Sequence, residues 1–88
     1  MNWDCRLSRL ASKQLKRLPR DRQTQLAGAI VEMSANPTIG DVRPIKSGKF
    51  AGTLRKRVGR YRIIFSIDVD NYLIKIAAIL YRTDTTYN

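Results

Sequence analysis

The sequence predicts an α+β fold, β-α-α-β-β-β in order, in which a helical hairpin packs on one face of an antiparallel sheet. Apolar residues recur at spacings of three and four in the first half of the chain and alternate with a period of two in the second half. Short turn sequences join the runs of the second half, which favours strands paired as hairpins. We expect one domain, residues 1–88, whose helices bury one sheet face and leave the other open.

A short strand and two helices account for the first half. Residues 3–7 (WDCRL) alternate between apolar and polar side chains, as a half-buried strand does. Ser8 is a suitable N-cap for the first helix, which Pro19 ends. The second helix opens near Asp21, whose carboxylate suits the positive end of the helix dipole, and it stops at the Asn-Pro pair 36–37. Because a single proline separates the two helices, they should form a hairpin.

A loop and three strands account for the second half. Residues 38–52 are rich in glycine and proline and are expected to form the loop. Turn sequences at 59–60 and 68–71 separate the strand-like runs and fold them into an antiparallel meander. The expected strands are residues 53–58, 61–67 and 72–80. The side chains expected to pack against the helices are Trp3, Tyr61, Ile63, Phe65 and Ile67.

The composition narrows the class of function. There are 17 Lys and Arg residues against 7 Asp and Glu, a net charge of +10, and such an excess usually serves a polyanion or an acidic partner. With no His and one cysteine, Cys5, a conventional zinc site, a His-dependent nucleophile and an internal disulfide are excluded. Cys5 is expected to be an inert, buried thiol. No apolar run approaches the ~20 residues of a membrane span, so we expect a cytoplasmic protein without membrane contact. We also expect no metal, since the chain has no histidine, and no cofactor.

The positive charge is concentrated in residues 43–62, a segment that contains no acidic residue. Strand alternation puts Arg55 and Arg57 on one face of their strand and Lys56 on the other. The next strand, joined by a tight hairpin, should bring Arg62 beside this arginine pair on the open face. Like charges on adjacent strands weaken their pairing, so the arrangement points to a bound anion.

Groups near the C-terminus are expected to join this basic face. Arg82 ends the last strand, Tyr81 precedes it, and Tyr87 follows five residues on. Guanidinium groups bind phosphate oxygens in bidentate fashion and tyrosine rings stack on unpaired bases, so the set suits single-stranded nucleic acid. The competing interpretation is a solvated basic face without a ligand and, for Tyr87, a frayed chain end.

The most specific sequence motif is Arg-x-Arg-Val-Gly-x-Tyr-Arg, residues 55–62, followed by apolar residues as far as Phe65. Other matching segments are residues 11–19 (ASKQLKRLP), 36–37 (NP), 42–46 (VRPIK) and the C-terminal Tyr81-Arg82 with Tyr87. In these segments the chain resembles the RelE/ParE superfamily of toxins from bacterial and archaeal toxin–antitoxin systems. The resemblance covers nearly the whole chain and implies the same β-α-α-β-β-β fold.

The resemblance implies a small toxin held inactive by a cognate antitoxin, an acidic protein from the same operon, with operator DNA bound only through their complex. RelE-type toxins cleave mRNA in the ribosomal decoding site, without a metal, by attack of a ribose 2′-hydroxyl on the adjacent phosphate. ParE-type toxins are similar in fold but poison DNA gyrase. The basic groups on the sheet favour the RelE type, with the ribosome and mRNA as targets. The alternatives are a gyrase inhibitor and an inactive homologue that acts only by binding its antitoxin.

The matched positions imply catalytic roles for five residues. Arg55 and Arg57 would flank the scissile phosphate, and Arg62 would stabilise the charge of the transition state. Arg82 would bind phosphate, while Tyr87 would orient the cleaved nucleotide. Arginine does not release its proton near neutral pH, so the general base is left open. The candidates for it are Tyr87, Tyr81, Asp84 and water.

Five more residues are expected to contact RNA or the ribosome: Lys46, Lys49, Lys56, Arg60 and Tyr81. For Lys46, Lys49 and Arg60 the alternative is a solvated loop charge. Lys56 stands where the family usually has an apolar residue, so its stem would pack while its ammonium reached water at the sheet edge.

Overall fold

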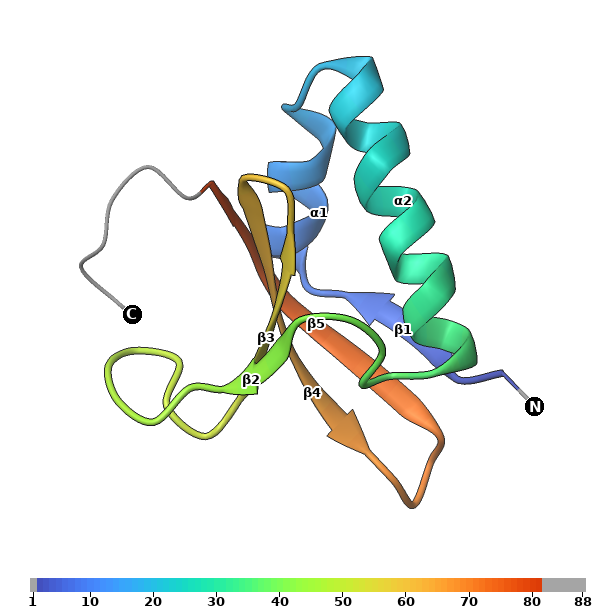
Figure 1. The fold of residues 1–88 in the computed structure, drawn as a ribbon, viewed down its shortest axis with the longest axis vertical. Helices are drawn as coiled ribbons and strands as arrows, with labels where there is room; N and C mark the ends of the chain where they lie inside the picture. Colours follow the sequence, from blue (N-terminus) through green and yellow to red (C-terminus); the bar gives the residue numbers. More distant parts are fainter. Residues whose placement is uncertain (1, 82–88) are drawn as a thin grey trace.

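The fold has two layers, a five-stranded sheet and a helical hairpin (Figure 1). The computed structural model describes residues 2–81. The elements are β1 (Asp4–Leu7), α1 (Arg9–Lys16), α2 (Arg20–Ala35), β2 (Val42–Pro44), β3 (Leu54–Val58), β4 (Tyr61–Asp68) and β5 (Leu73–Tyr81). The strands lie in the order β1-β5-β4-β3-β2, with β1 parallel to β5 and the other neighbours antiparallel. The predicted α+β class, with a helical hairpin on one face of the sheet, is confirmed.

Strand β2 is an element that the sequence did not predict. It lies within the expected loop 38–52, and its three residues are too few to show an alternating pattern. It forms because Val42 and Pro44 find partners in β3, opposite Lys56 and Leu54. This pairing extends the sheet by one edge strand and brings Asp41, the residue before β2, beside the arginines of the open face.

Helix α1 is tied to β5 through its N-cap, as the sequence predicted. The Ser8 hydroxyl oxygen accepts a hydrogen bond of 3.0 Å from the Ala11 N–H, and the same hydroxyl donates one of 2.7 Å to the Ala77 carbonyl. Ala77 lies at a β-bulge, where Ile64 pairs with Ala78 but the next residue, Phe65, pairs with Ile76. The bulge removes Ala77 from the ladder, and Ser8 satisfies its carbonyl.

The core lies between the helices and one face of the sheet. The fully buried side chains with the largest volumes are Phe65, Leu26, Met33, Ile63, Ile74 and Ile76. Tyr61 joins this cluster, and Ile67 and Trp3 pack at its edge, so the predicted packing of these residues is confirmed. The Trp3 ring also lies against the Tyr72 ring, with centroids 4.9 Å apart.

The second face of the sheet is left open by the helices. Figure 1 shows both helices on one side, while the chain that follows β2 loops out on the other. Backbone hydrogen bonds close this loop, from the Ile45 N–H to the Thr53 carbonyl at 2.8 Å and from the Gly52 N–H to the Ile45 carbonyl at 2.9 Å. Within residues 2–81, neither helix has the length and apolar character to cross a membrane.

Candidate functional site

A groove of about 480 Å³ lies on the open face, between the sheet and the loop that follows β2. Its basic lining residues are Arg43, Lys46, Lys49, Arg55, Arg57 and Arg62. Its apolar lining residues are Pro44, Ile45, Phe50, Ile64 and Leu80. The groove therefore combines a strongly positive wall with an apolar floor.

Sheet register brings the arginines together. Arg57 of β3 lies directly opposite Arg62 of β4, and Arg55 lies directly opposite Arg43 of β2. Residues opposite one another in an antiparallel ladder project to the same face, so two like-charged pairs share the groove. The prediction that Arg62 stands beside Arg55 and Arg57 is confirmed.

The four arginines lie at different depths. Arg62 is only 5% exposed and lies deepest, while the exposed fractions of the side chains rise through Arg55 (15%) and Arg57 (35%) to Arg43 (74%). Within the described residues, the buried Nε of Arg57 has no hydrogen-bond partner. A buried guanidinium donor is costly to leave unbonded, so this N–H is suited to an incoming acceptor.

The carboxylate of Asp41 lies among three of these guanidinium groups. Asp41 Oδ1 is 3.4 Å from Arg55 Nη1 and 3.7 Å from Arg43 Nε, and Oδ2 is 3.8 Å from Arg57 Nε. Charge-assisted hydrogen bonds are usually about 2.7–2.9 Å long, so the Arg55 contact is a long hydrogen bond and the other two contacts are mainly electrostatic. Asp41 lies just outside the acid-free segment 43–62, and strand β2 brings it into the cluster.

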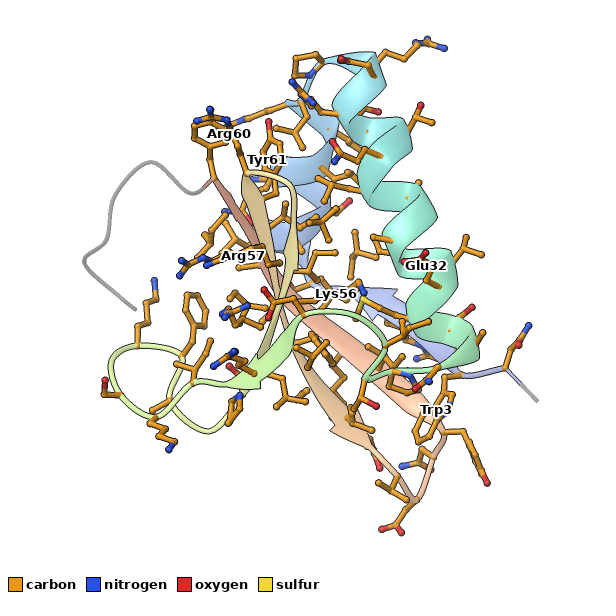
Figure 2. The ribbon with its side chains drawn as sticks, in the orientation of Figure 1. Trp3, Glu32, Lys56, Arg57, Arg60 and Tyr61 are labelled. Carbon is orange, nitrogen blue, oxygen red and sulfur yellow. The ribbon has the colours of Figure 1, made fainter. Side chains whose placement is uncertain are left out.

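Lys56 does not belong to the groove. Its ammonium donates a 2.6 Å hydrogen bond to the Ile39 carbonyl and lies 3.9 Å from Glu32 Oε1 on α2. Figure 2 shows Lys56 directed toward α2 and Arg57 directed away from it. With its side chain 5% exposed, the predicted water-exposed ammonium is wrong. The loop before β2 covers this ammonium and gives it an acceptor.

Tyr81 lies on the other side of the sheet from the groove. Its ring packs edge-on against Tyr61, which it faces across the β4–β5 ladder, with centroids 5.1 Å apart. The bulge at Ala77 reverses the alternation of β5, so Tyr81 joins the helix-facing side and Leu80 takes the groove side. The expectation that Tyr81 lies on the open basic face is therefore wrong.

The remaining expected residues divide into three groups. Lys46 and Lys49 line the groove as expected. Arg60, in the β3–β4 turn, lines a separate cleft of about 200 Å³ that Tyr81 and Arg22 also border. Arg82, Asp84 and Tyr87 lie outside the described residues.

Sequence reasoning missed the apolar floor of the groove. Ile64 shares the face of Arg62 by simple alternation, so the sequence carried this signal. Phe50 carried no such signal, because only the fold of the loop after β2 brings it to the groove. Lys49 Nζ lies 5.7 Å from the centroid of the Phe50 ring. The planar ring of Phe50, in a groove lined by guanidinium groups, suits a base whose phosphate binds those groups.

Cys5 lies on β1, away from the groove. Its thiol donates a weak hydrogen bond of 3.9 Å to the Ile30 carbonyl of α2. Burial, and then the charge of Asp4, raise the pKa of this thiol, so it is a poor nucleophile at neutral pH. Within residues 2–81, no group of three or more Cys, Asp or Glu side chains is placed to hold a metal ion.

One family model covers nearly the whole chain. Residues 5–85 match the family model described as the ParE toxin of the type II toxin–antitoxin system parDE. No curated protein sequence matches the chain significantly.

Solved structures share the fold at low sequence identity. The RelBE2 toxin–antitoxin complex of Mycobacterium tuberculosis is 24% identical, with a TM-score of 0.80 over 93% of this chain and 100% of that one. The RelE–RelB complex of Pyrococcus horikoshii is 22% identical, with a TM-score of 0.81 over 97% and 100%. The isolated RelE toxin of Escherichia coli is 14% identical, with a TM-score of 0.72 over 94% and 87%.

Proposed function

Since the chain belongs to the family of ParE toxins of type II toxin–antitoxin systems, within the RelE/ParE superfamily, we propose that this toxin is a ribosome-dependent mRNA endonuclease of the RelE kind. The observation that carries the proposal is the gathering of Arg55, Arg57 and Arg62 on the wall of one groove. The superfamily includes both nucleases and gyrase inhibitors, and a basic groove with an apolar floor is what an RNA substrate needs.

The proposed reaction is attack of a ribose 2′-hydroxyl on the adjacent phosphate. The new O2′–P bond forms a 2′,3′-cyclic phosphate as the P–O5′ bond breaks, and the leaving oxygen takes up a proton to become a 5′-hydroxyl. Negative charge increases on the non-bridging oxygens in the transition state. Fixed guanidinium groups stabilise that charge, which assigns this role to Arg62 and to the pair Arg55 and Arg57.

The proton of the 2′-hydroxyl needs an acceptor that arginine does not supply. The position of Tyr81 on the helix-facing side removes it from the candidates for this role. The proposal therefore assigns the proton to water or to the C-terminal groups Asp84 and Tyr87, with Arg82 as a further phosphate ligand. These three residues lie outside the described residues.

The apolar floor supports a nucleotide as the occupant of the groove. Ligand pockets of roughly 300–1,000 Å³ with apolar walls and a few convergent polar groups are typical of small-molecule sites. A base placed against Phe50 and Ile45 leaves its phosphate near the arginine wall. Lys46 and Lys49, at the mouth of the groove, are proposed to contact the neighbouring RNA backbone.

The partners proposed for this toxin follow from its family and from its positive charge. As a toxin of a type II system it has a cognate antitoxin, and several of the similar structures are RelB–RelE complexes. We expect an acidic antitoxin from the same operon that covers part of the basic face, because complementary charge speeds association. Operator DNA is expected to bind only through that complex, and the toxin is expected to act in the cytoplasm, where its ribosomal target lies.

A decoding-site cleavage assay tests the proposal. Programmed ribosomes incubated with the protein should yield mRNA cut in the decoding site, and a 2′-deoxyribose at that position should abolish cleavage. Arg57→Gln should reduce cleavage at least a hundredfold, whereas Arg9→Gln, an exposed control on α1, should retain wild-type activity. Intact mRNA in this assay would refute the nuclease proposal.

A DNA gyrase inhibitor is the second candidate, because the matching family model is described by the parDE system. A supercoiling assay run in parallel separates the two. Inhibition of gyrase without RNA cleavage would establish this alternative, and the absence of both activities with retained antitoxin binding would identify an inactive homologue.

A further inference from the structure

Asp41 is not one of the residues that line the groove, but within residues 2–81 its carboxylate pairs with three arginines that do. One carboxylate faces three guanidinium groups, those of Arg43, Arg55 and Arg57, at 3.4–3.8 Å. The cluster keeps a surplus of positive charge, so a second anion is still attracted to it. The carboxylate nevertheless lies beside the donors that an incoming phosphate would use.

The fold fixes the position of Asp41 from several sides. The Asp41 carbonyl accepts a 3.0 Å hydrogen bond from the Arg57 N–H and a 3.4 Å one from Arg55 Nη1. Two residues earlier, the Ile39 carbonyl is held by Lys56 Nζ at 2.6 Å. Between them Gly40 has φ +85°, and a Cβ there would lie 2.8 Å from Lys56 Nζ. The buried lysine thus supports the backbone that presents the carboxylate.

The side chain of Asp41 is held less firmly than its backbone. Its contacts to the guanidinium groups are longer than ordinary charge-assisted hydrogen bonds, and the side chain is 42% exposed. Arg57 Nε, 3.8 Å from Asp41 Oδ2, is buried and has no hydrogen-bond partner among residues 2–81. The carboxylate therefore offsets one of the three positive charges and leaves Arg57 Nε without a hydrogen bond.

We propose that Asp41 is an internal counter-ion that competes with the RNA phosphate for the arginine groove. With the groove empty, its carboxylate limits the repulsion among the three guanidinium groups. When a phosphodiester enters, the two anions oppose one another, and Asp41 lowers the affinity for any polyanion that the groove meets in free solution. Asp41 therefore makes the groove selective between two kinds of phosphate. An RNA phosphate that is also positioned by contacts outside the groove binds, whereas a phosphate of a polyanion in free solution binds weakly. The inference rests on the anion-binding part of the proposed function and is independent of cleavage.

Charge-removing variants test the proposal directly. Asp41→Asn keeps the shape and an acceptor oxygen while removing the charge, and Asp41→Ser is a second neutral variant. The matched control is Asp4→Asn on β1, the opposite edge strand of the sheet, where Asp4 makes an exposed ion pair of 3.2 Å with Arg6. Each of the three variants raises the net charge by one from +10. A general gain in positive charge therefore affects all three equally.

The measurement is the affinity of the purified chain for a short, fluorescent, single-stranded 2′-deoxyoligonucleotide, which cannot be cleaved by 2′-hydroxyl attack. Both neutral Asp41 variants should bind it roughly fivefold more tightly than the wild type, which is about 1 kcal/mol. Asp4→Asn should change the affinity less than twofold, and Asp41→Glu should stay within twofold of the wild type. Circular dichroism of each variant confirms that it is folded.

The outcomes separate this proposal from the proposed function. If the folded Asp41→Asn and Asp41→Ser variants bind no more tightly than Asp4→Asn, or more weakly than the wild type, Asp41 is only a scaffold for the arginines and the proposal is overturned. Should both bind more tightly while wild-type protein leaves ribosomal mRNA intact, the counter-ion role stands and the nuclease proposal fails. Cleavage of ribosomal mRNA without tighter binding by the Asp41 variants would support the nuclease and overturn the counter-ion role.

Discussion

Replacing Lys56 by methionine separates a structural lysine from an RNA-binding one. The Lys56 ammonium is enclosed between α2 and the loop before β2, and it donates a 2.6 Å hydrogen bond to the Ile39 carbonyl. Methionine has a similar length and fills the same space, so Lys56→Met removes the charge and the donor while keeping the packing. We expect the variant to be less stable and to bind nucleic acid as the wild type does.

The size of the effect follows from the two contacts of Lys56. A hydrogen bond to a charged group contributes roughly 1.5–3 kcal/mol, and losing it leaves the Ile39 carbonyl without this donor. The ion pair with Glu32 adds little, because it spans 3.9 Å and the Glu32 side chain is 61% exposed. The free energy of unfolding should therefore fall by about 2 kcal/mol. For a domain of this size, Tm should drop by about 10 °C.

Thermal unfolding followed by circular dichroism measures this loss, and the control is Lys46→Met at the mouth of the groove. The control should keep the wild-type Tm within about 3 °C, since exposed substitutions change stability by only ~0.5 kcal/mol. It should also weaken oligonucleotide binding, which Lys56→Met should not. A Lys56→Met protein with unchanged Tm and weakened binding would refute the buried position of this lysine.

Three further predictions follow from the contacts described. Ser8→Ala should lower the free energy of unfolding by about 2 kcal/mol in urea titrations, about 1 for the N-cap and about 1 for the hydrogen bond to Ala77. The control is Ser34→Ala, because the Ser34 hydroxyl donates to the Val31 carbonyl of its own helix; this variant should lose less than half as much free energy of unfolding. Equal losses in the two variants would contradict the N-cap role of Ser8. Phe50→Ala should weaken oligonucleotide binding roughly tenfold by removing a stacking surface, and equal weakening of pyrophosphate binding would count against a base at this position. Because burial and the Asp4 charge raise the pKa of the Cys5 thiol, iodoacetamide should alkylate it more slowly at pH 8 in the folded chain than in urea. The raised pKa also makes a linked contribution to stability, which is present below the unfolded pKa of the thiol and is lost as pH rises through the raised, folded pKa. Equal rates of alkylation in the folded chain and in urea would contradict the raised pKa of this thiol.

Much of the fold and part of the groove could be predicted because they depend on local patterns. The alternation of strand residues alone placed Arg55 and Arg57 on one face, and the two-residue turn placed Arg62 beside them. The N-cap at Ser8 is equally local, since it needs only a hydroxyl at the start of an apolar stripe.

The rest of the groove depends on pairing between distant segments. Asp41 enters the cluster because β2 pairs with β3, and a three-residue strand has too little pattern to be recognised. Tyr81 changes face because of a bulge four residues before it, which an unbroken alternation does not reveal. The burial of Lys56 required the loop before β2 to fold over it and offer the Ile39 carbonyl.

The graded depth of the arginines gives the protein two different responses to ionic strength. Arg43, at the rim, stands in solvent, where salt at physiological concentration shortens electrostatic reach to about 8 Å. Arg62 is only 5% exposed, so salt screens its interaction with a bound phosphate much less. Raising salt should therefore slow the arrival of a polyanion at the toxin far more than it hastens the departure of one already seated.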